Sequence, residues 1–589
     1  MKRYLCVAFL LGMAFVACAR ASAPPVESAD DGKGWTYTWE EDQEVWGSSD
    51  LITNIPGTFT GADVAPIVGA DTFHNNGIRG QNTISTNIEA GHVWDGHESL
   101  GHVSSRTSHS NAPSSGWATP AYDRHATWVG MMIGGRRGGG TPGIWQDGIA
   151  QDTDLRSGAI ATTWNSPAYS TSFGATVSTL DFPYSATASG FGTADVINSS
   201  WGALGSGSTD STRTGTDIRA TIVDSLADDN PGTTFVVSAG NNGSATNTVG
   251  SPGAGYNGIT VGALANDGSN NYDSIASFSS RGPQAYADPV NGAIGPSTAQ
   301  RAAVDIAAPG TNLTSAFYGG QSGGNDPNLT GSSATPGTNL YSGGIQGTSF
   351  SAPIAAGGVA LMHSGADAAG LTATAHDARV VKANLLNSAR KIPGWDNGQS
   401  PHPNGNGGVL TTQALDFDSG TGALALDRTY NQYLQGETDI PGLTGGISTK
   451  ITGWDFAGVD LGDHTDIILD SSFGAGSELR ATLAWFRERD YTDATNQTDV
   501  GFADLNLQVW DSTFSTLYSE SSSTYTPVEH LAFTLPVSGQ YGLRVDYPTN
   551  VFGGLTSETF GVAWHVPEPG GFLMLILGGL MVLQRRRSR

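Results

Sequence analysis

Cysteine is nearly absent from this chain: Cys6 and Cys18 are the only two in 589 residues. Both fall within residues 1–23, where Lys2 and Arg3 precede an apolar run and a group of small residues, the layout of a cleaved secretory signal. A mature chain without thiols excludes disulfides, cysteine proteolysis, thiol redox chemistry and zinc–thiolate sites. Attachment of a lipid to Cys18 is the alternative interpretation of this leader.

Positively charged side chains are also scarce. Lys and Arg total 28 against 54 Asp and Glu, and the formal net charge is −26. Nucleic-acid binding depends on clustered cationic side chains at the phosphates, so we expect no nucleic-acid partner. A strongly acidic surface instead favours a protein that stays soluble outside a cell.

Long apolar runs are missing as well, except at the two ends of the chain. Near the C-terminus, VPEPGG at 566–571 is followed by an apolar stretch at 572–583 and by three arginines at 585–587. The basic end is expected to remain in the cytoplasm. This tail, 566–589, resembles the PEP-CTERM sorting signal, which implies an exosortase-like processing enzyme and transient membrane association. A retained tail anchor is the alternative, and both imply export to the cell surface or surroundings of a bacterial envelope.

Three patterns divide the exported body. Residues 24–65 are polar and rich in glycine without a clear period, so we expect an N-terminal extension there. Over 66–440 short apolar runs alternate with helical segments, which predicts an α/β domain with a mostly parallel sheet flanked by helices. The expected strands are 83–88, 195–199, 233–238, 258–264 and 302–306, and the expected helices are 125–133, 216–229 and 349–363. Over 445–565 the helical signals vanish, and alternating segments predict an all-β sandwich. Its expected strands are 479–485, 505–510, 530–535 and 541–545.

The strongest chemical signal is GTSFSAP at 347–353, which is followed by further small residues. Small side chains let such a segment begin a buried helix against neighbouring backbone, with Ser349 at the positive end of the helix dipole. A serine there can also be a simple N-cap. Four more strings accompany it: NSSWG at 198–202, SAGNNG at 238–243, SFSSRGP at 277–283 and VDIAAPG at 304–310.

Together these strings resemble the subtilase family of serine peptidases, and the resemblance runs from about residue 77 to 435. It implies a subtilisin-like α/β fold followed by a jelly-roll-like domain, and protein or peptide substrates. Ser349 takes the place of the family's nucleophile and Asn241 that of its oxyanion-hole asparagine. The block HATWVG at 125–130 matches the family's histidine block, so His125 is the expected general base. The resemblance implies no required cofactor, while calcium is possible as a structural ion.

The family's catalytic aspartate is replaced here by Glu89. The segment GIRGQNTISTNIEAG at 77–91 matches the family's acid strand, and Glu89 stands at its C-terminal end, where α/β sheets place their ligands. Glutamate keeps the charge of aspartate on one more methylene, so it can still fix the histidine tautomer. Asp71 and Asp95 are alternative acids that lack this strand context. Sedolisins also use glutamate, but they carry Asp at the oxyanion position and no such histidine.

Substrate-binding residues follow from the same resemblance. Ser200, Trp201 and Gly202 are expected to form one wall of a cleft that pairs with the substrate as an added strand. Gly240 belongs to the oxyanion block, and Gly250 resembles the floor of the primary specificity pocket. A glycine floor without a carboxylate predicts a roomy, neutral pocket for large apolar side chains.

Metal ligands stay unassigned. Three histidines recur every five residues in HVWDGHESLGH at 92–102, a step that does not align them on one helical face, so we expect a loop and not a zinc site. The acidic stretches 489–493 and 504–506 have oxygen ligands for calcium but no defined loop pattern, and the run 504–511 is expected to be an exposed strand.

Three functions are compatible with these residues. The first is an active serine endopeptidase that hydrolyses peptide bonds. The second is a binding protein on a subtilase fold, inactivated by Glu89 and by a histidine block in which Trp128 replaces the family's second histidine. The third is a surface protein whose 445–565 domain binds matrix polysaccharide.

Overall fold

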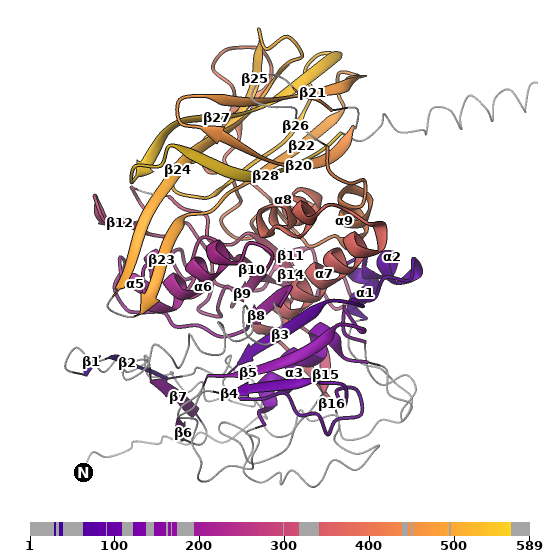
Figure 1. The fold of residues 1–589 in the computed structure, drawn as a ribbon, viewed down its shortest axis with the longest axis vertical. Coiled ribbons are helices and arrows are strands. Elements are labelled where there is room, and N and C mark those ends of the chain that lie inside the picture. Colours follow the sequence, from indigo (N-terminus) through magenta and orange to yellow (C-terminus); the bar gives the residue numbers. More distant parts are fainter. Residues whose placement is uncertain are drawn as a thin grey trace, which may run out of the picture.

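The computed structural model describes residues 63–89, 91–108, 122–136, 147–160, 194–298, 300–316, 341–438, 451–493 and 496–566, together with short backbone strands within 29–38, 163–172 and 446–448. The expected leader 1–23 and the tail from residue 567 lie outside these residues. An α/β region and a β-rich region lie at opposite ends of the molecule (Figure 1). No helix among the described residues combines the length and apolar character needed to cross a membrane.

A mostly parallel sheet forms the centre of the α/β region. Its strands run in the order β11-β10-β9-β8-β3-β5-β4, with β14 also paired to β10. Only β11 is antiparallel to its neighbour among these pairs, so the predicted α/β class is confirmed. The strands are β3 (Ile84–Glu89), β4 (Ser105–Ser108), β5 (Asp154–Ala159), β8 (Val196–Ser199), β9 (Thr234–Ser238), β10 (Ile259–Ala265), β11 (Ser274–Ile275) and β14 (Ile306–Pro309).

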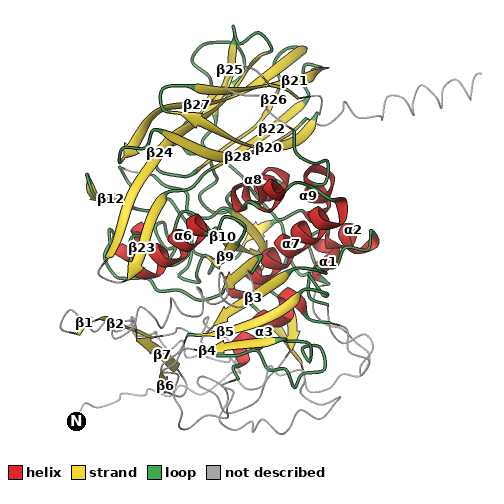
Figure 2. Cartoon of the chain, viewed as in Figure 1, coloured by secondary structure: helices red, strands yellow, loops and turns green. Residues whose placement is uncertain are grey.

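Helices cover both faces of this sheet (Figure 2). Successive strand side chains point to opposite faces. Accordingly Val196 and Val236 join the core that contains α3 and α7, while their neighbours Ile197 and Phe235 join the core of α6. The larger helices are α3 (Arg124–Gly134), α6 (Ile218–Asp229), α7 (Thr348–Ala369), α8 (Ala378–Ser388) and α9 (Leu426–Tyr433).

Shorter elements connect these layers. They are α1 (Val64–Ile67), α2 (Ala70–Asn75), α5 (Ser211–Thr214), the 3-10 helix η2 (Ala373–His376), and the hairpins β12 (Tyr286–Asp288) with β13 (Gly292–Ile294) and β15 (Leu313–Ala316) with β16 (Tyr341–Ile345). A separate sheet joins β1 (Ala29–Asp30), β2 (Gly34–Thr38), β7 (Ala168–Ser172) and β6 (Thr163–Asn165). Part of the N-terminal extension therefore pairs with the segment that precedes β8.

One expected strand of the α/β region was misplaced. The prediction put a strand at 302–306, whereas β14 begins only at Ile306. The Asp305 carboxylate accepts the backbone N–H of Thr260 at 2.8 Å and lies 3.1 Å from Lys382 Nζ. The Asp305 carboxylate thus accepts a hydrogen bond that a backbone carbonyl of a neighbouring strand would otherwise accept. The other expected strands and helices of this region are confirmed, and α7 extends beyond the expected end at 363.

The C-terminal region is rich in strands, as predicted, and consists of two sheets. One has the order β20-β28-β22-β26, and the other the order β17-β18-β25-β24-β27-β21-β19 with β23 paired to β24. Leu483 of β22 and Val562 of β28 share one core with Leu507 of β24 and Leu543 of β27, so the two sheets pack face to face. The jelly-roll-like arrangement stays a prediction. The strands are β17 (Ser400–Pro401), β18 (Val409–Thr411), β19 (Gly446–Ser448), β20 (Thr452–Asp460), β21 (His464–Phe473), β22 (Glu478–Ala484), β23 (Glu488–Asp493), β24 (Asn496–Asp511), β25 (Leu517–Ser521), β26 (Val528–Thr534), β27 (Gly539–Phe552) and β28 (Ser557–His565).

Two features link this region to the α/β region. Strand β18 lies before the boundary expected near residue 440, yet it pairs in parallel with β25. The long hairpin of β23 and β24 also extends away from its sheet to lie beside α6 (Figure 1). There Arg489 Nη1 donates to Asp224 Oδ2 of α6 at 2.7 Å, and both side chains are buried. The chain therefore ties its two regions together by a shared sheet and by buried charge.

Candidate active site

Ser349 lies in the first turn of α7, at the end of the helix that faces the C-terminal edge of the sheet. Its side chain is buried, and its hydroxyl donates to the backbone oxygen of Ser200 at 2.9 Å. Ser200 is the residue directly after β8. The sequence-predicted nucleophile is thereby held against the strand that was expected to bind substrate.

Pro353 explains why Ser200 is needed at this position. An α-helix bonds each carbonyl to the N–H four residues later, and proline has no N–H, so the carbonyl of Ser349 loses its helical partner. The Ser200 hydroxyl donates to that carbonyl at 2.8 Å instead. The two serines therefore exchange hydrogen bonds, and the strings NSSWG and GTSFSAP depend on one another.

His125 and Glu89 form a buried pair. Glu89 is the last residue of β3 and His125 lies in the first turn of α3, whose N-cap Asp123 accepts the backbone N–H of Ala126 at 2.8 Å. The Nδ1 of His125 lies 3.0 Å from Oε2 of Glu89, and both side chains are almost fully buried. With an ionised Glu89, whose carboxylate only accepts hydrogen bonds, Nδ1 is the donor and Nε2 is the basic nitrogen. Burial raises the pKa of Asp123, while the adjacent His125 opposes that shift.

Packing brings this pair next to the start of α7. The ring of His125 lies 5.9 Å from the ring of Phe350, the residue that follows Ser349. Trp128 contacts the same Phe350 edge-on, at 5.9 Å, and is buried, in keeping with its expected packing role. The residues expected to supply base and nucleophile therefore start two helices that touch one another.

Two asparagines that the sequence analysis did not single out as functional join these helices through the sheet. Asn87 of β3 donates to the backbone oxygen of Ala126 at 3.1 Å, and Asn198 of β8 donates to Asn87 at 3.1 Å. Asn198 also donates to the Ser200 hydroxyl at 3.0 Å. A line of neutral hydrogen bonds thus runs from the first turn of α3 to Ser349. Asn198, which follows the apolar Val196 and Ile197 in buried β8, was the available signal, whereas polar-rich β3 gave none for Asn87.

Asn241 follows β9 and faces the same helix start. Its Oδ1 accepts from the backbone N–H of Thr348 at 2.9 Å and from the Thr348 hydroxyl at 3.0 Å. Because Thr348 holds the amide oxygen of Asn241, the NH₂ group of that amide points away from Thr348. Gly240 has φ of +103°, a conformation that residues with side chains rarely adopt, and its N–H donates to the Thr348 hydroxyl at 3.1 Å. This turn sets the amide of Asn241 beside the residue that precedes Ser349.

The other expected substrate-binding residues lie at the adjoining strand. Trp201 is buried among apolar side chains of the α6 face, so only its backbone remains for strand pairing. Gly202 and Gly250 flank the antiparallel bridge between Ala203 and Ser251. A Cβ at Gly250 would lie 2.5 Å from the Ala203 oxygen, so close backbone packing alone requires glycine there. Its role as a pocket floor stays a prediction.

The alternative acids have other partners or positions. Asp95 pairs with Arg106 and accepts the Tyr122 hydroxyl at 2.6 Å, while Asp71 is exposed in the first turn of α2. The geometry favours Glu89 as the partner of His125 over either aspartate.

Two of the three histidines of 92–102 hydrogen-bond to serine hydroxyls. His92 Nδ1 lies 3.2 Å from the Ser157 hydroxyl, and His97 Nδ1 lies 2.6 Å from the Ser99 hydroxyl. Within the described residues, a different trio of potential metal ligands comes together. In the first acidic stretch considered for calcium, Arg489 forms buried ion pairs. In the second, burial raises the pKa of Asp504 to about 6. Calcium binding stays a prediction.

The model of the subtilase family matches residues 55–413, which include Glu89, His125, Asn241 and Ser349. The chain belongs to the subtilase family. Members are serine-type peptidases that act on proteins or peptides and are commonly secreted. The match ends before β20, so most of the β-rich region of this subtilase lies outside it. No curated protein matches the sequence.

Proposed function

We propose that this subtilase is an exported serine endopeptidase in which Glu89, His125 and Ser349 form the catalytic triad. The observation that carries this proposal is the buried contact of 3.0 Å between His125 Nδ1 and Glu89 Oε2, next to the start of α7. A glutamate in this position keeps the tautomer that leaves Nε2 unprotonated, as the triad mechanism requires.

Catalysis begins when Ser349 Oγ attacks the peptide carbonyl carbon and its proton passes to His125 Nε2. To do so, the hydroxyl must leave the Ser200 oxygen to which it donates in this structure. Glu89 stabilises the resulting imidazolium. His125 then gives the proton to the leaving amine, and water hydrolyses the acyl-enzyme by the same route in reverse.

The charge on the tetrahedral oxygen needs donors. In our proposal these are the amide NH₂ of Asn241 and the backbone N–H of Ser349. The hydrogen bonds from Thr348 to Asn241 Oδ1 support this role, since they hold the amide in one orientation before substrate arrives. Such pre-oriented donors stabilise the transition state without reorganisation at the moment of reaction.

Cleavage of an unfolded protein substrate by the purified secreted chain tests the proposal. Ser349→Ala should abolish cleavage, and Ser351→Ala is the matched control. Ser351 lies in the same turn of α7 and is equally buried, but its hydroxyl donates to Pro309 O at 3.2 Å, away from Ser200. Equal cleavage by the Ser349→Ala variant and wild type would refute the assignment.

Export and processing of the tail are part of the proposal. They are supported by the order of VPEPGG, apolar stretch and arginines after residue 565. Processing by an exosortase-like enzyme predicts a released form whose intact mass ends near residues 566–569. A full-length tail in the released protein would contradict it.

A further inference from the structure

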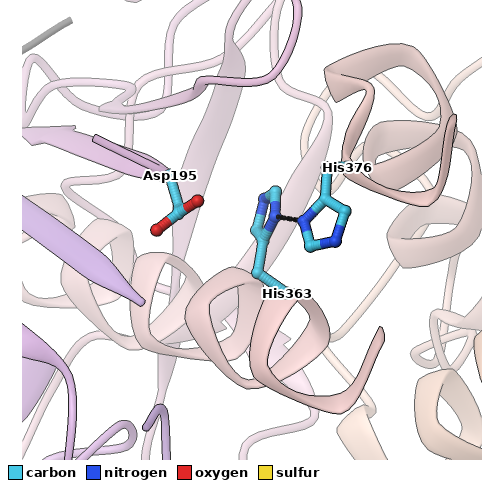
Figure 3. Close-up of side chains that lie close together, drawn as sticks. All are labelled: Asp195, His363 and His376. Carbon is cyan, nitrogen blue, oxygen red and sulfur yellow. Dashed lines mark hydrogen bonds between the residues drawn. The ribbon is translucent and has the colours of Figure 1, made fainter. Parts of the chain in front are cut away.

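A second cluster of ionisable side chains lies at the other end of α7. Asp195 directly precedes β8, His363 projects from α7, and His376 ends η2 (Figure 3). Each offers one atom that can bind a metal, and these three atoms lie within 4.8 Å of one another. The cluster therefore unites three elements that are distant in the sequence.

The protons in this cluster can be placed. His363 Nδ1 and His376 Nδ1 lie 2.7 Å apart, so one of them carries a proton and the other accepts it. Asp367 Oδ1 lies 3.3 Å from His376 Nε2, which favours a proton on that nitrogen and leaves His376 Nδ1 as the acceptor. His363 therefore donates from Nδ1 and its Nε2 is unprotonated.

That Nε2 is an unsatisfied group. It is fully buried and has no hydrogen-bond partner in the described part of the chain. The two Nδ1 atoms face one another, so a cation that displaces the proton between them gains both nitrogens as ligands, whereas Nε2 lies on the opposite edge of the His363 ring.

Asp195 supplies an anionic ligand. Its Oδ2 accepts the backbone N–H of Ile84 at 2.7 Å, which orients the carboxylate and leaves Oδ1 outside that bond.

We propose that Asp195, His363 and His376 bind one divalent transition-metal ion of the zinc class. Two imidazoles and a carboxylate are a typical zinc set, whereas calcium prefers oxygen ligands alone. Ligands of one tetrahedral zinc lie roughly 3.4 Å apart, so side-chain shifts of about 1 Å complete the site. Asp367 acts through His376, as a carboxylate that orients a metal-bound histidine.

The site is structural in this proposal. His363 lies 14 residues beyond Ser349 on α7, which at about 1.5 Å per residue places it roughly 21 Å from the nucleophile along the helix. The ion would fasten the second half of α7 to the start of β8 and to η2. The proposal is independent of the peptidase function and stands or fails separately from it.

Zinc binding by the full exported chain tests it. The Ser349→Ala background prevents self-cleavage, and EDTA followed by dialysis removes bound metal. Calorimetric titration with Zn²⁺ should give one site per chain with submicromolar Kd, and saturation should raise Tm by a few degrees. Co²⁺ in place of zinc should give visible absorption bands of a tetrahedral nitrogen–oxygen site.

Variants then assign the ligands. His376→Gln and Asp195→Asn should each weaken Zn²⁺ binding at least about 100-fold and abolish the Tm shift, while Asp367→Asn should weaken it by about 10- to 100-fold. His464→Gln is the control, because half-exposed His464 also lies 3.7 Å from two aspartates, Asp463 and Asp466, but outside the cluster. Absence of stoichiometric zinc in the parent chain, or equal binding by the parent and both ligand variants, would overturn the proposal.

Discussion

The two regions of this subtilase surround their buried charge differently. In the α/β region the hydrogen bonds that link α3 to α7 beside the Glu89–His125 pair run through neutral asparagines and serines, and the N-cap carboxyl of Asp123 is the charged group next to His125. Where the β-rich region meets α6, full charges are packed together instead. Neutral hydrogen bonds therefore join the helices around the proposed catalytic pair, whereas permanent charges join the two regions.

Arginines dominate that second contact. The guanidinium groups of Arg301, Arg487 and Arg489 lie 4.3, 4.4 and 5.0 Å from the ring centre of Tyr256. Asp499 neutralises both Arg487 and Arg489, at 2.8 and 2.6 Å. Arg487 and Arg489 depend on their counter-ions, so loss of one partner leaves a buried charge without compensation.

The largest effect is expected at the catalytic pair. Glu89→Gln should lower turnover by about 10⁴ with little change in substrate binding, because an amide can hold the wrong tautomer and gives the imidazolium no counter-charge. Steady-state kinetics with a peptide substrate measure this. Asp95→Asn is the control and should stay near wild type, since Asp95 pairs with Arg106. Near-normal turnover of Glu89→Gln would place the acid elsewhere.

Breaking the arginine contact should lower the stability of the protein. Arg489→Met keeps volume but leaves Asp224 buried without its cation, so the free energy of unfolding should fall by about 3–5 kcal/mol. Arg390→Met removes a half-exposed pair with Asp273 and should cost at most about 1 kcal/mol. Urea denaturation compares the two. Equal, small losses would show that the buried charges do not join the regions.

The oxyanion donor is expected to have the next largest effect. Asn241→Ala should lower kcat by about 10²–10³ and change KM little, because the donor acts in the transition state. The exposed neighbour Asn242 provides the control, Asn242→Ala, with kcat near wild type. A rise in KM at constant kcat would instead indicate that Asn241 binds substrate in its ground state.

The last effect concerns pH. Burial raises the pKa of Glu558 on β28 from 4.5 to about 8, so the folded protein holds this proton more tightly than the unfolded chain. Its contribution is complete below pH 4.5 and is lost as pH rises towards 8, with a slope of up to about 1.4 kcal/mol per pH unit.

Glu558→Gln should therefore lessen the fall in Tm between pH 5 and pH 8 relative to wild type. The exposed Glu478 on the same sheet gives the control, Glu478→Gln, which should leave the pH profile unchanged. An identical profile for the Glu558→Gln variant and wild type would show that this carboxyl titrates alike in the folded and unfolded states.

Local sequence patterns were sufficient to predict much of the α/β region. Apolar runs predicted most strands of the parallel sheet, and small residues after Ser349 predicted the buried start of α7. Glu89 and His125 were identified through the resemblance to the subtilase family, and the structure brings them together.

Long-range contacts were beyond those patterns. Nothing in the spacing of Asp195, His363 and His376 shows that the fold brings them together. The charged segment around Arg489 was considered only as a possible calcium-binding stretch, yet packing against α6 buries that arginine completely. Side chains that substitute for backbone bonds, such as Asp305, likewise shift a strand without a local signal.

Covalent labelling by a fluorophosphonate probe tests the catalytic assignment most directly, because the probe reacts only with an activated serine. The folded, secreted wild-type chain should gain one adduct, located by mass spectrometry on Ser349, while Ser351→Ala labels equally and Ser349→Ala does not label. Glu89→Gln should label far more slowly than wild type. A wild-type chain that is folded yet takes up no probe, or an adduct on another serine, would contradict the proposed triad.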